Sequence, residues 1–333
     1  MSTKKRVLIC GASGFLGRNI FERLASRIDI ELAGTYNTNR FSNDRRLHHA
    51  NLTSEDRVNQ LLERVDAVIV ASAVTTGSRD VKERPYIHIT DNNIMNQLLI
   101  RAAFEKKVSQ LIYFGCSVPY SSSDIPVKET DLNLNDGMNP AYFGVGWMKI
   151  YTEKTCEFFS RLGQTRFTVI RHSNIYGPHD KYDLERSHMF GATITKVLTA
   201  KNGDSLVVWG SGQEKRDLLY ISDLVDFVEL ALDKQDYVFD AFNVGYGSSI
   251  SVNDLVSKII ETSGKQLSMK HDLSKPTIPV NITLDISKAG EKFGWHPQIS
   301  LNDGIARTIA WYRQNIIKKY SRIIAGFYPH THL

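Results

Sequence analysis

The feature that most constrains the fold is a glycine-rich turn near the N-terminus, between an apolar run and a helical pattern. Val7–Cys10 reads Val-Leu-Ile-Cys, and the turn Gly-Ala-Ser-Gly-Phe-Leu-Gly follows at once. In a strand–turn–helix unit, such glycines allow a tight turn, close approach to a pyrophosphate and close helix packing. The helix N-terminus offers free N–H groups and a partial positive charge for phosphates. A purely structural turn is the alternative, but the context favours a dinucleotide site at Gly11, Ser13, Gly14, Phe15, Leu16 and Gly17.

The first half of the chain alternates between apolar runs and helical periodicity. Buried strands are expected at 6–10, 30–35, 66–71, 109–114 and 166–171, and helices at 15–27, 54–64, 88–106 and 147–162. Such alternation is typical of a parallel sheet with helices on both faces. The sequence therefore predicts the α/β class, with a doubly wound parallel sheet of the Rossmann type.

The pattern is less regular after residue 178. Short strands are expected at 205–209 and 241–244, and helices at 187–199, 222–233, 252–263 and 301–318, with loops at Pro276, Pro279 and Pro297. We predict a dinucleotide-binding domain at 1–177. A smaller α/β substrate-binding part is expected at 178–320, with some elements crossing back to the first domain. Residues 321–333 read as a surface tail.

Composition narrows the class of partner. The chain has 333 residues and 42% hydrophobic content, with no apolar stretch near the ~18 residues of a membrane helix. Its basic N-terminus runs directly into a strand instead of a signal-peptide core, so a cytoplasmic protein without a membrane partner is expected. Three scattered cysteines predict neither a disulfide framework nor a metal site. The net charge of +5 is dispersed, which argues against nucleic acid and suits an anionic small molecule.

The second strand indicates which dinucleotide binds. An acid at its tip would bind the ribose 2′-hydroxyl and repel a 2′-phosphate, and residues 32–40 contain no acid. Arg18 and Arg40 are near enough in sequence to reach such a phosphate, although both can equally be solvated arginines. The pattern favours NADP over NAD. The adenine and ribose are expected to lie against Asn51, Leu52, Ala71, Ser72 and Ala73.

Several separate segments carry a resemblance to a known family. They are Asn174–Asp180, Ser187-His188, Val207–Gly212, Asn243–Gly245, Ser274–Pro276 and Gly294-Trp295. Together they resemble the extended short-chain dehydrogenase/reductases, and among these the GDP-fucose synthases, over residues 6–315. The resemblance implies an NADP-dependent epimerase or 4-keto reductase acting on a nucleoside-diphosphate sugar, with GDP-linked sugars ahead of CDP-, dTDP- and UDP-linked ones. It also implies a homodimer paired through helices 88–106 and 147–162.

The resemblance assigns roles to individual residues. Lys149 matches the lysine that holds the nicotinamide ribose, and His188 matches a histidine that serves as acid or base on the sugar. Asn174, Lys196, Trp209 and Arg216 match positions near the sugar nucleotide. Arg216 suits a diphosphate because a guanidinium can bind it bidentately, the alternative being a surface arginine paired with Asp217 or Asp223.

Three positions depart from the family pattern. The family carries a tyrosine one helical turn before the lysine, where the ammonium lowers the phenol's pKa, and this chain has Val145 there. Cys116 stands in place of the usual serine, and Val118 stands in place of the epimerising cysteine. Valine cannot pass a proton, so the proton relay of this chain must differ from that of the family.

Three explanations of the missing tyrosine remain open. Tyr142 supplies the phenol if Gly144 and Gly146 make the chain before Lys149 irregular, since seven residues of regular helix span about 10.5 Å. Otherwise Cys116, Ser117, His188 or a water handles the proton, although Cys116 can equally be an inert buried thiol. In the third explanation, the protein binds NADP and a nucleotide sugar without turning them over. The enzyme is favoured, because Lys149 and the expected sugar-nucleotide residues persist.

Overall fold

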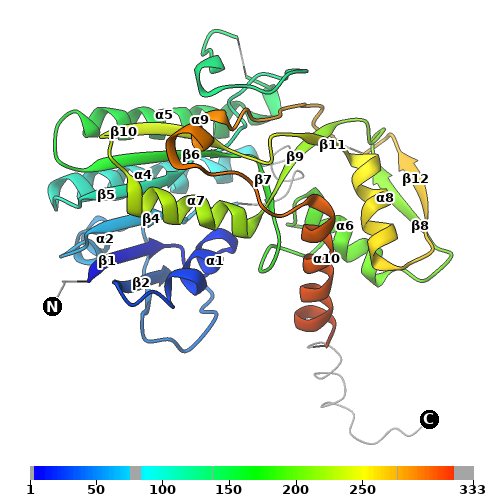
Figure 1. The fold of residues 1–333 in the computed structure, drawn as a ribbon, viewed down its shortest axis with the longest axis horizontal. Helices are drawn as coiled ribbons and strands as arrows, with labels where there is room; N and C mark the ends of the chain where they lie inside the picture. Colours follow the sequence, from blue (N-terminus) through cyan, green and yellow to red (C-terminus); the bar gives the residue numbers. More distant parts are fainter. Residues whose placement is uncertain (1–3, 76–83, 137, 276, 319–333) are drawn as a thin grey trace, which may run out of the picture.

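The computed structural model describes residues 4–75, 84–136, 138–275 and 277–318 (Figure 1). The predicted tail at 321–333 and the loop marker Pro276 lie outside the described residues. In the described part of the chain, no helix is long and apolar enough to cross a membrane.

The centre of the fold is a parallel sheet. Within the described residues it has seven strands in the order β10-β6-β5-β4-β1-β2-β3, all paired in parallel. Their bounds are β1 Lys5–Cys10, β2 Ile30–Tyr36, β3 Leu47–His49, β4 Ala67–Val70, β5 Gln110–Phe114, β6 Arg166–His172 and β10 Phe239–Val244. Every residue of β4 and β5 is buried, as expected for strands covered on both faces.

Helices cover the sheet on both faces. One core packs the sheet against α1 (Phe15–Leu24) and α7 (Ile221–Lys234). The other packs it against α2 (Glu55–Leu61), α4 (Thr90–Glu105) and α5 (Phe143–Ser160). This confirms the predicted doubly wound α/β fold. Because the strands are parallel, their carboxyl ends meet at one edge, where ligands bind in such folds.

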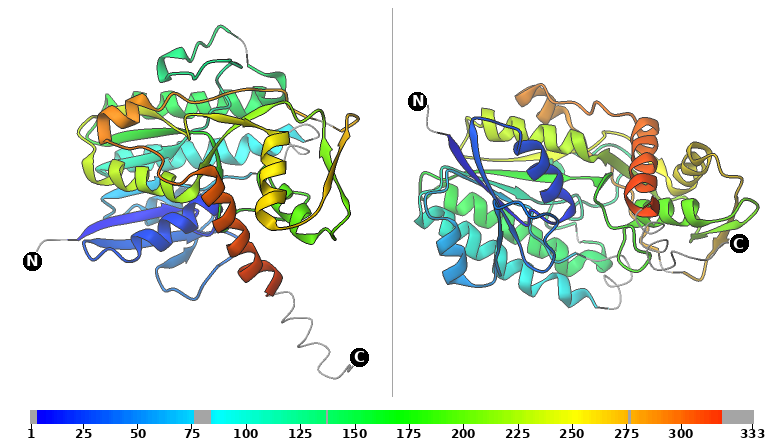
Figure 2. Two further views of the ribbon diagram at one scale, coloured as in Figure 1. Left: turned by 45° about the vertical axis from the view of Figure 1, so that its right-hand side comes forward. Right: turned by 90° about the horizontal axis from the view of Figure 1, so that it is seen from below.

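The substrate part gathers beyond this edge (Figure 2). In the described residues it contains a three-stranded sheet, β11-β9-β7, and a two-stranded sheet, β12-β8. Their bounds are β7 Asn174–Tyr176, β8 Ser205–Trp209, β9 Lys215–Tyr220, β11 Ser249–Ser251 and β12 Ser268–Asp272. Helices α6 (Met189–Thr199) and α8 (Val252–Ser263) pack beside these strands, and α10 (Leu301–Tyr312) contacts α8 and β9, whereas α9 (Ser287–Phe293) packs against β10 of the main sheet. Strand β10 crosses back to the main sheet, whereas the division at residue 177 stays a prediction.

Short turns of helix complete the chain. They are η1 Pro85–His88, η2 Glu129–Asp131, η3 Pro140–Tyr142 and the π-helical η4 Arg313–Ile317. One boundary corrects the sequence reading: the helix expected at 147–162 begins four residues earlier, at Phe143, directly after η3. Gly144 and Gly146 lie inside that helix and do not interrupt it.

Candidate active site

The glycine turn between β1 and α1 forms a cradle that larger residues would fill. Gly11 has φ +83°, and a Cβ there would come within 2.6 Å of Ser72 Cα. A Cβ on Gly17 would lie 2.2 Å from the Gly11 carbonyl oxygen. Gly14 is exposed and provides no side-chain cap for α1, whose first turn contains no acid. The N–H groups at the start of α1 are therefore suited to an anionic ligand.

A dinucleotide fits this cradle. The hydroxyl of Ser72 is buried against the turn and has no hydrogen-bond partner in the structure, so a ligand hydroxyl or phosphate there would satisfy it. Ala71 N–H donates to the Cys10 carbonyl at 2.9 Å, which holds the end of β4 beside the end of β1. Ser13 is partly exposed next to this space, as are Phe15 and Leu16. The turn and the segment after β4 are the groups that would hold the pyrophosphate and ribose.

The tip of β2 combines cations with aromatic rings. Arg18 lies 4.7 Å from the centre of the Phe41 ring and pairs with Glu22 at 2.8 Å. Arg40 is exposed, lies 5.9 Å from the Tyr36 ring centre and donates to the Asp44 carbonyl at 2.7 Å. Both guanidinium groups thus lie at the strand end where a cofactor ribose is expected.

The residues predicted to lie against the adenine and ribose differ in their exposure. Leu52 is buried in the core, whereas Asn51 is exposed and accepts hydrogen bonds from the N–H and hydroxyl of Thr53. Ala71 is partly exposed and Ala73 is exposed. Asn51 and the Ala71–Ala73 segment remain accessible to a ligand, while the Leu52 side chain belongs to the packing beneath them.

Lys149 is held at the carboxyl end of β5. Its Nζ donates to the Phe114 carbonyl at 2.7 Å and lies 4.9 Å from the centre of the Tyr113 ring. Burial lowers the pKa of Lys149, and the neighbouring Cys116 raises it in opposition. One N–H is occupied by the carbonyl, so two remain for another ligand, which is the arrangement needed to hold ribose hydroxyls.

The segment before Lys149 is regular helix, which decides the geometry of the missing tyrosine. Val145 lies one turn before Lys149 within α5 and is partly exposed. Tyr142 stands outside the helix, at its N-cap, and is partly buried. Burial raises the pKa of Tyr142, Arg216 lowers it and Cys116 raises it, so the phenol lies in the field of both groups. The helix from Phe143 onward is regular, so the irregular chain that would bring Tyr142 to the place of the missing tyrosine is not seen in α5.

Cys116 and Ser117 follow β5 and are partly exposed. Burial raises the pKa of the Cys116 thiol, with Lys149 and the Val118 N–H opposing. Cys10 and Cys156, in contrast, are fully buried in the core. Cys116 therefore differs from the two inert thiols, although its raised pKa keeps it protonated at neutral pH.

Two histidines have lowered pKa values in this part of the structure, and one of them was not predicted from the sequence. His188 is the N-cap residue of α6; desolvation lowers its pKa, and Lys181 and His88 lower it further. His172 ends β6, and burial lowers its pKa to about 4; the hydrogen bond to the Ser173 carbonyl opposes this shift, while Lys149 and His188 add to it. A histidine at the carboxyl end of a central strand was the available sequence signal for His172.

Asn174 and Arg216 link the edge of the main sheet to the substrate part. Asn174 Nδ2 donates to the Asp217 carbonyl at 3.0 Å. Arg216 donates to the carbonyls of Lys215, Val280 and Ile278 at 2.7–3.0 Å. Among the described residues, the Arg216 guanidinium bonds to carbonyls and forms no ion pair with Asp217 or Asp223. A diphosphate would have to compete with these carbonyls for the guanidinium.

The remaining expected substrate residues lie farther out, on the β8–β12 sheet. Trp209 ends β8 with 38% of its side chain exposed, and Lys196 Nζ lies 5.5 Å from its ring centre. Lys196 also donates to the Val207 carbonyl at 3.2 Å, and burial lowers its pKa. The pair offers an exposed aromatic face beside an ammonium, a combination suited to a base or sugar ring.

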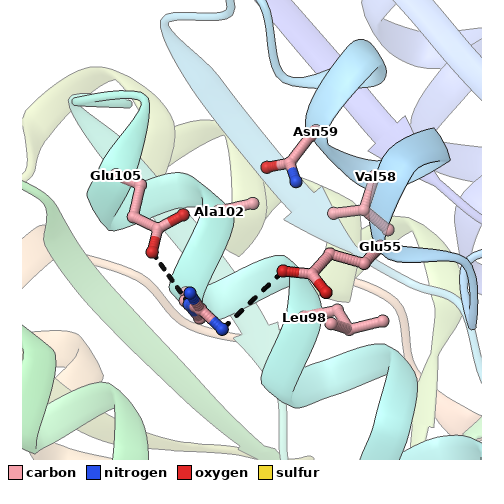
Figure 3. A pocket seen from close by; sticks show the side chains of 7 residues that line it. Glu55, Val58, Asn59, Leu98, Ala102 and Glu105 are labelled. Carbon is pink, nitrogen blue, oxygen red and sulfur yellow. Dashed lines mark hydrogen bonds and ion pairs between the residues drawn. The ribbon is translucent and has the colours of Figure 1, made fainter.

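A hollow between α2 and α4 is not part of this site (Figure 3). Val58, Asn59, Leu98 and Ala102 line it, and Arg101 contacts Glu55 at 3.7 Å and Glu105 at 2.8 Å within it. Helix α4 ends shortly before β5 begins, so this hollow lies toward the amino edge of the sheet. The paired charges give it no free recognition group, and it carries no functional argument.

The comparisons with known proteins agree with this geometry. Residues 7–245 match the model of the NAD dependent epimerase/dehydratase family, which confirms the predicted family. The GDP-L-fucose synthase of Escherichia coli (strain K12) is 29% identical over 324 residues, covering 94% of this chain and 98% of that protein. Relatives that carry the names of synthases and epimerases favour an enzyme over a protein that only binds.

Solved structures share the fold. The UDP-glucose 4-epimerase of Thermotoga maritima, in a structure with UDP-glucose, matches with a TM-score of 0.80 at 24% identity, covering 93% of this chain and 99% of that one. The UDP-glucuronic acid 4-epimerase of Bacillus cereus, in complex with UDP-glucuronic acid and NAD, matches with a TM-score of 0.80 at 23% identity and the same coverage. At these identities the likeness establishes the architecture of the chain.

Proposed function

Because this chain belongs to the NAD dependent epimerase/dehydratase family, we propose that it is an NADP-dependent enzyme that epimerises or reduces a 4-keto nucleoside-diphosphate sugar. A GDP-linked sugar is the first candidate, since the E. coli relative matched over nearly its whole length is a GDP-L-fucose synthase. UDP-, dTDP- and CDP-linked sugars follow.

One observation carries the proposal. Lys149 is fixed by the Phe114 carbonyl at the same carboxyl edge as the glycine turn after β1. An ammonium held there with two free N–H groups can orient a nicotinamide ribose whose pyrophosphate lies on the turn. Asn174 and Arg216 then stand between that position and the substrate part.

Different residues of the site would bind the cofactor and transfer the proton. A bound dinucleotide would supply hydride transfer, while Lys149 orients it and Ser72 accepts or donates a hydrogen bond beside it. Proton exchange at the sugar oxygen falls to a group other than Val145. Cys116, Ser117, His188 and Tyr142 are the candidates from the sequence, and proton transfer by a positioned group is typically worth 10²–10⁴-fold.

Activity is tested with a panel of 4-keto and 4-hydroxy nucleotide sugars, following NADPH absorbance and product mass. We expect turnover of at least one nucleoside-diphosphate sugar and a rise in thermal stability with it. A ligand at 100 times its Kd adds about 2.7 kcal/mol. Stabilisation without product would favour the binding-protein alternative, and no stabilisation by any nucleotide sugar would reject both functions.

The NADP preference rests on Arg18 and Arg40 at the tip of β2. Either guanidinium can exchange its present partner for a 2′-phosphate, which it would bind with charge-assisted hydrogen bonds. Replacing each by Ala is expected to weaken NADPH binding at least ~10-fold, about 1.4 kcal/mol, and to leave NADH binding nearly unchanged. Arg307→Ala, at an exposed position of α10, is the control. Tighter binding of NADH than NADPH by the unaltered protein would reverse the assignment.

A homodimer is the proposed assembly. Phe143, Trp147 and Tyr151 recur every four residues on α5 and are 62%, 38% and 57% exposed, and Ile94 on the adjacent α4 is 39% exposed. A stripe of this kind on neighbouring helices is suited to self-association about a two-fold axis. Trp147→Glu is expected to give a monomeric mass by light scattering, whereas Ile28→Glu, an isolated exposed site, is not. A monomer for the unaltered protein at micromolar concentration would contradict the proposal.

A further inference from the structure

We propose that His172 is a catalytic residue of this enzyme, exchanging a proton with the reacting oxygen of the sugar through Nε2. The role rests on the proposed nucleotide-sugar function. It gives the site a proton-transfer group on β6, in place of the one that Val145 fails to supply on α5.

The position of His172 is fixed by the main chain. Its carbonyl accepts a hydrogen bond from the Ser117 N–H at 3.1 Å, which holds the end of β6 beside the turn that follows β5. Its ring centre lies 6.3 Å from that of Phe114, edge to face. The Phe114 carbonyl also holds Lys149 Nζ at 2.7 Å. His172 and Lys149 are therefore anchored to the same residue at the carboxyl edge of the sheet.

The hydrogen bonding of the ring defines which nitrogen can react. Nδ1 lies 2.7 Å from the Ser173 carbonyl oxygen. A carbonyl only accepts, so Nδ1 carries the hydrogen and donates it. In the neutral ring the lone pair is then on Nε2, which is the nitrogen left for a substrate hydroxyl. His172 as a residue is of intermediate exposure, and the hydrogen bond described for its ring involves Nδ1 and not Nε2.

The charges around the ring belong to the site. Burial is the largest cause of the lowered pKa of His172, the hydrogen bond to the Ser173 carbonyl opposes it, and the charges of Lys149 on α5 and His188 at the start of α6 lower it further. Cys116 follows β5, and the charge of Lys149 lowers its pKa against the larger effect of burial. The resulting pKa of about 4 keeps His172 neutral at pH 7. A neutral ring with a fixed tautomer is ready to accept a proton over the whole physiological range.

The proton step balances at Nε2. When a sugar hydroxyl carbon is oxidised, the O–H bond breaks, its proton forms a bond to Nε2, and its electron pair becomes the second C–O bond. A bound oxidised dinucleotide, which the proposed function requires, would take up the C–H electron pair as hydride. In the reverse direction the imidazolium returns the proton to the oxygen. The low pKa makes His172 a weak base, so redox turnover is expected to be slow compared with relatives that keep the tyrosine.

The test compares His172→Gln with His296→Gln, a control at an exposed position before α10. Glutamine preserves polarity but cannot take up a proton. We expect His172→Gln to lower kcat at least ~10²-fold with KM for the nucleotide sugar changed less than about threefold. His296→Gln should match the unaltered enzyme. Turnover by His172→Gln at the unaltered rate would overturn the proposal, as would a loss confined to Cys116→Ala or His188→Ala.

A second measurement does not depend on turnover. The Cε1–H resonance of His172 is followed by NMR against pH, in the unaltered protein and in Lys149→Met. If the two side chains face one another, removing the ammonium raises the pKa of His172, and adding the nucleotide sugar alone shifts its resonance. An unchanged titration in Lys149→Met together with no response to the sugar would overturn the assignment even if activity fell.

These outcomes separate the two proposals. If the unaltered protein turns over no nucleotide sugar and is stabilised by none, the proposed function fails. If it turns over a sugar and His172→Gln does so equally well, only the role of His172 fails.

Discussion

Arg171 and His172 are neighbours on β6, yet their side chains have opposite kinds of surroundings. The Arg171 guanidinium is buried and donates to the Glu153 carboxylate, to the Tyr120 hydroxyl at 2.8 Å and to the Glu129 carbonyl at 2.9 Å. His172 is partly exposed, and its pKa is lowered by burial and by nearby cations. Because successive side chains point to opposite faces of a strand, one step along β6 separates a closed network from an open site.

The contrast between Arg171 and His172 distinguishes polar residues that stabilise the fold from polar residues that are suited to catalysis. Burial would lower the pKa of Arg171, but Glu153 more than compensates and raises it. Around His172 the Ser173 carbonyl stabilises the ionised ring, but the charged neighbours Lys149 and His188 add to the cost of burial. A group whose ionised form has no counter-charge beside it is the kind that functional sites retain. From this contrast we assign Arg171 a role in the stability of the fold and His172 a role in the proposed reaction.

The largest expected effect comes from breaking the closed network. Glu153→Gln removes the counter-charge of a buried guanidinium, and such a change typically costs about 3–5 kcal/mol. Glu157→Gln, one turn later on α5, disrupts pairs with Lys154 and Arg161, which are 58% and 71% exposed, and should cost no more than about 1 kcal/mol. Urea unfolding of the two variants measures the difference. Equal losses would mean that the Arg171 network contributes no more than a surface pair.

The next largest effect is expected at Lys149, which belongs with His172 to the candidate active site. Lys149→Met keeps most of the buried stem but removes the N–H groups that would orient the ribose, so we expect kcat/KM to fall at least ~10²-fold, about 2.7 kcal/mol. Lys154→Met, exposed on the same helix, is the control. Thermal unfolding should change little in either variant. A loss of folding stability in Lys149→Met as large as in Glu153→Gln would place Lys149 in the framework as well.

Restoring the missing phenol tests the reading of α5. Val145 lies one turn before Lys149 on a regular helix. It is partly exposed, so the larger side chain of a tyrosine can be accommodated at this position. Val145→Tyr is expected to raise redox turnover at least ~10-fold, about 1.4 kcal/mol in barrier, by adding a proton donor whose pKa the ammonium lowers. Val145→Phe is the matched control without the hydroxyl. No gain over Val145→Phe would show that position 145 does not face the reacting oxygen.

Much of this arrangement was accessible from the sequence because it depends on local periodicity. The runs that become β1, β5 and α1 show their period and their boundary residues directly. Strands β3, β7, β9, β11 and β12 were not anticipated. Strands β3, β7 and β11 have three residues each, which is too short to show alternation, and β9 and β12 pair with strands distant in the chain.

In the candidate site, too, relations within one helix could be predicted from the sequence and contacts between distant segments could not. Val145 and Lys149 could be related by counting along one helix, as the regular α5 bears out. His172 could not be related to Lys149 in this way, because strand pairing places the end of β6 beside the end of β5, and Lys149 reaches that end from α5 through the Phe114 carbonyl. Arg216 likewise finds its carbonyl partners in residues 278–280, more than sixty positions away. Contacts made by tertiary packing leave no local signal to read.

The smallest expected effect is a pH dependence of stability that belongs to His172. Its pKa is about 4 in the folded protein and ~6.5 in an unfolded chain, so folding favours the neutral ring. The stabilisation relative to the protonated form is therefore complete above pH 6.5 and is lost as the pH falls toward 4. Between pH 7.5 and 5.0 the unaltered protein should lose about 1 kcal/mol more stability than His172→Gln, after allowance for solvent screening of a partly exposed ring. Urea unfolding of both proteins at the two pH values measures this difference, in which the other titrating groups cancel. Equal losses in the two proteins would show that the pKa of His172 is the same in the folded protein as in solvent. The contrast between the surroundings of His172 and those of Arg171 would then be wrong.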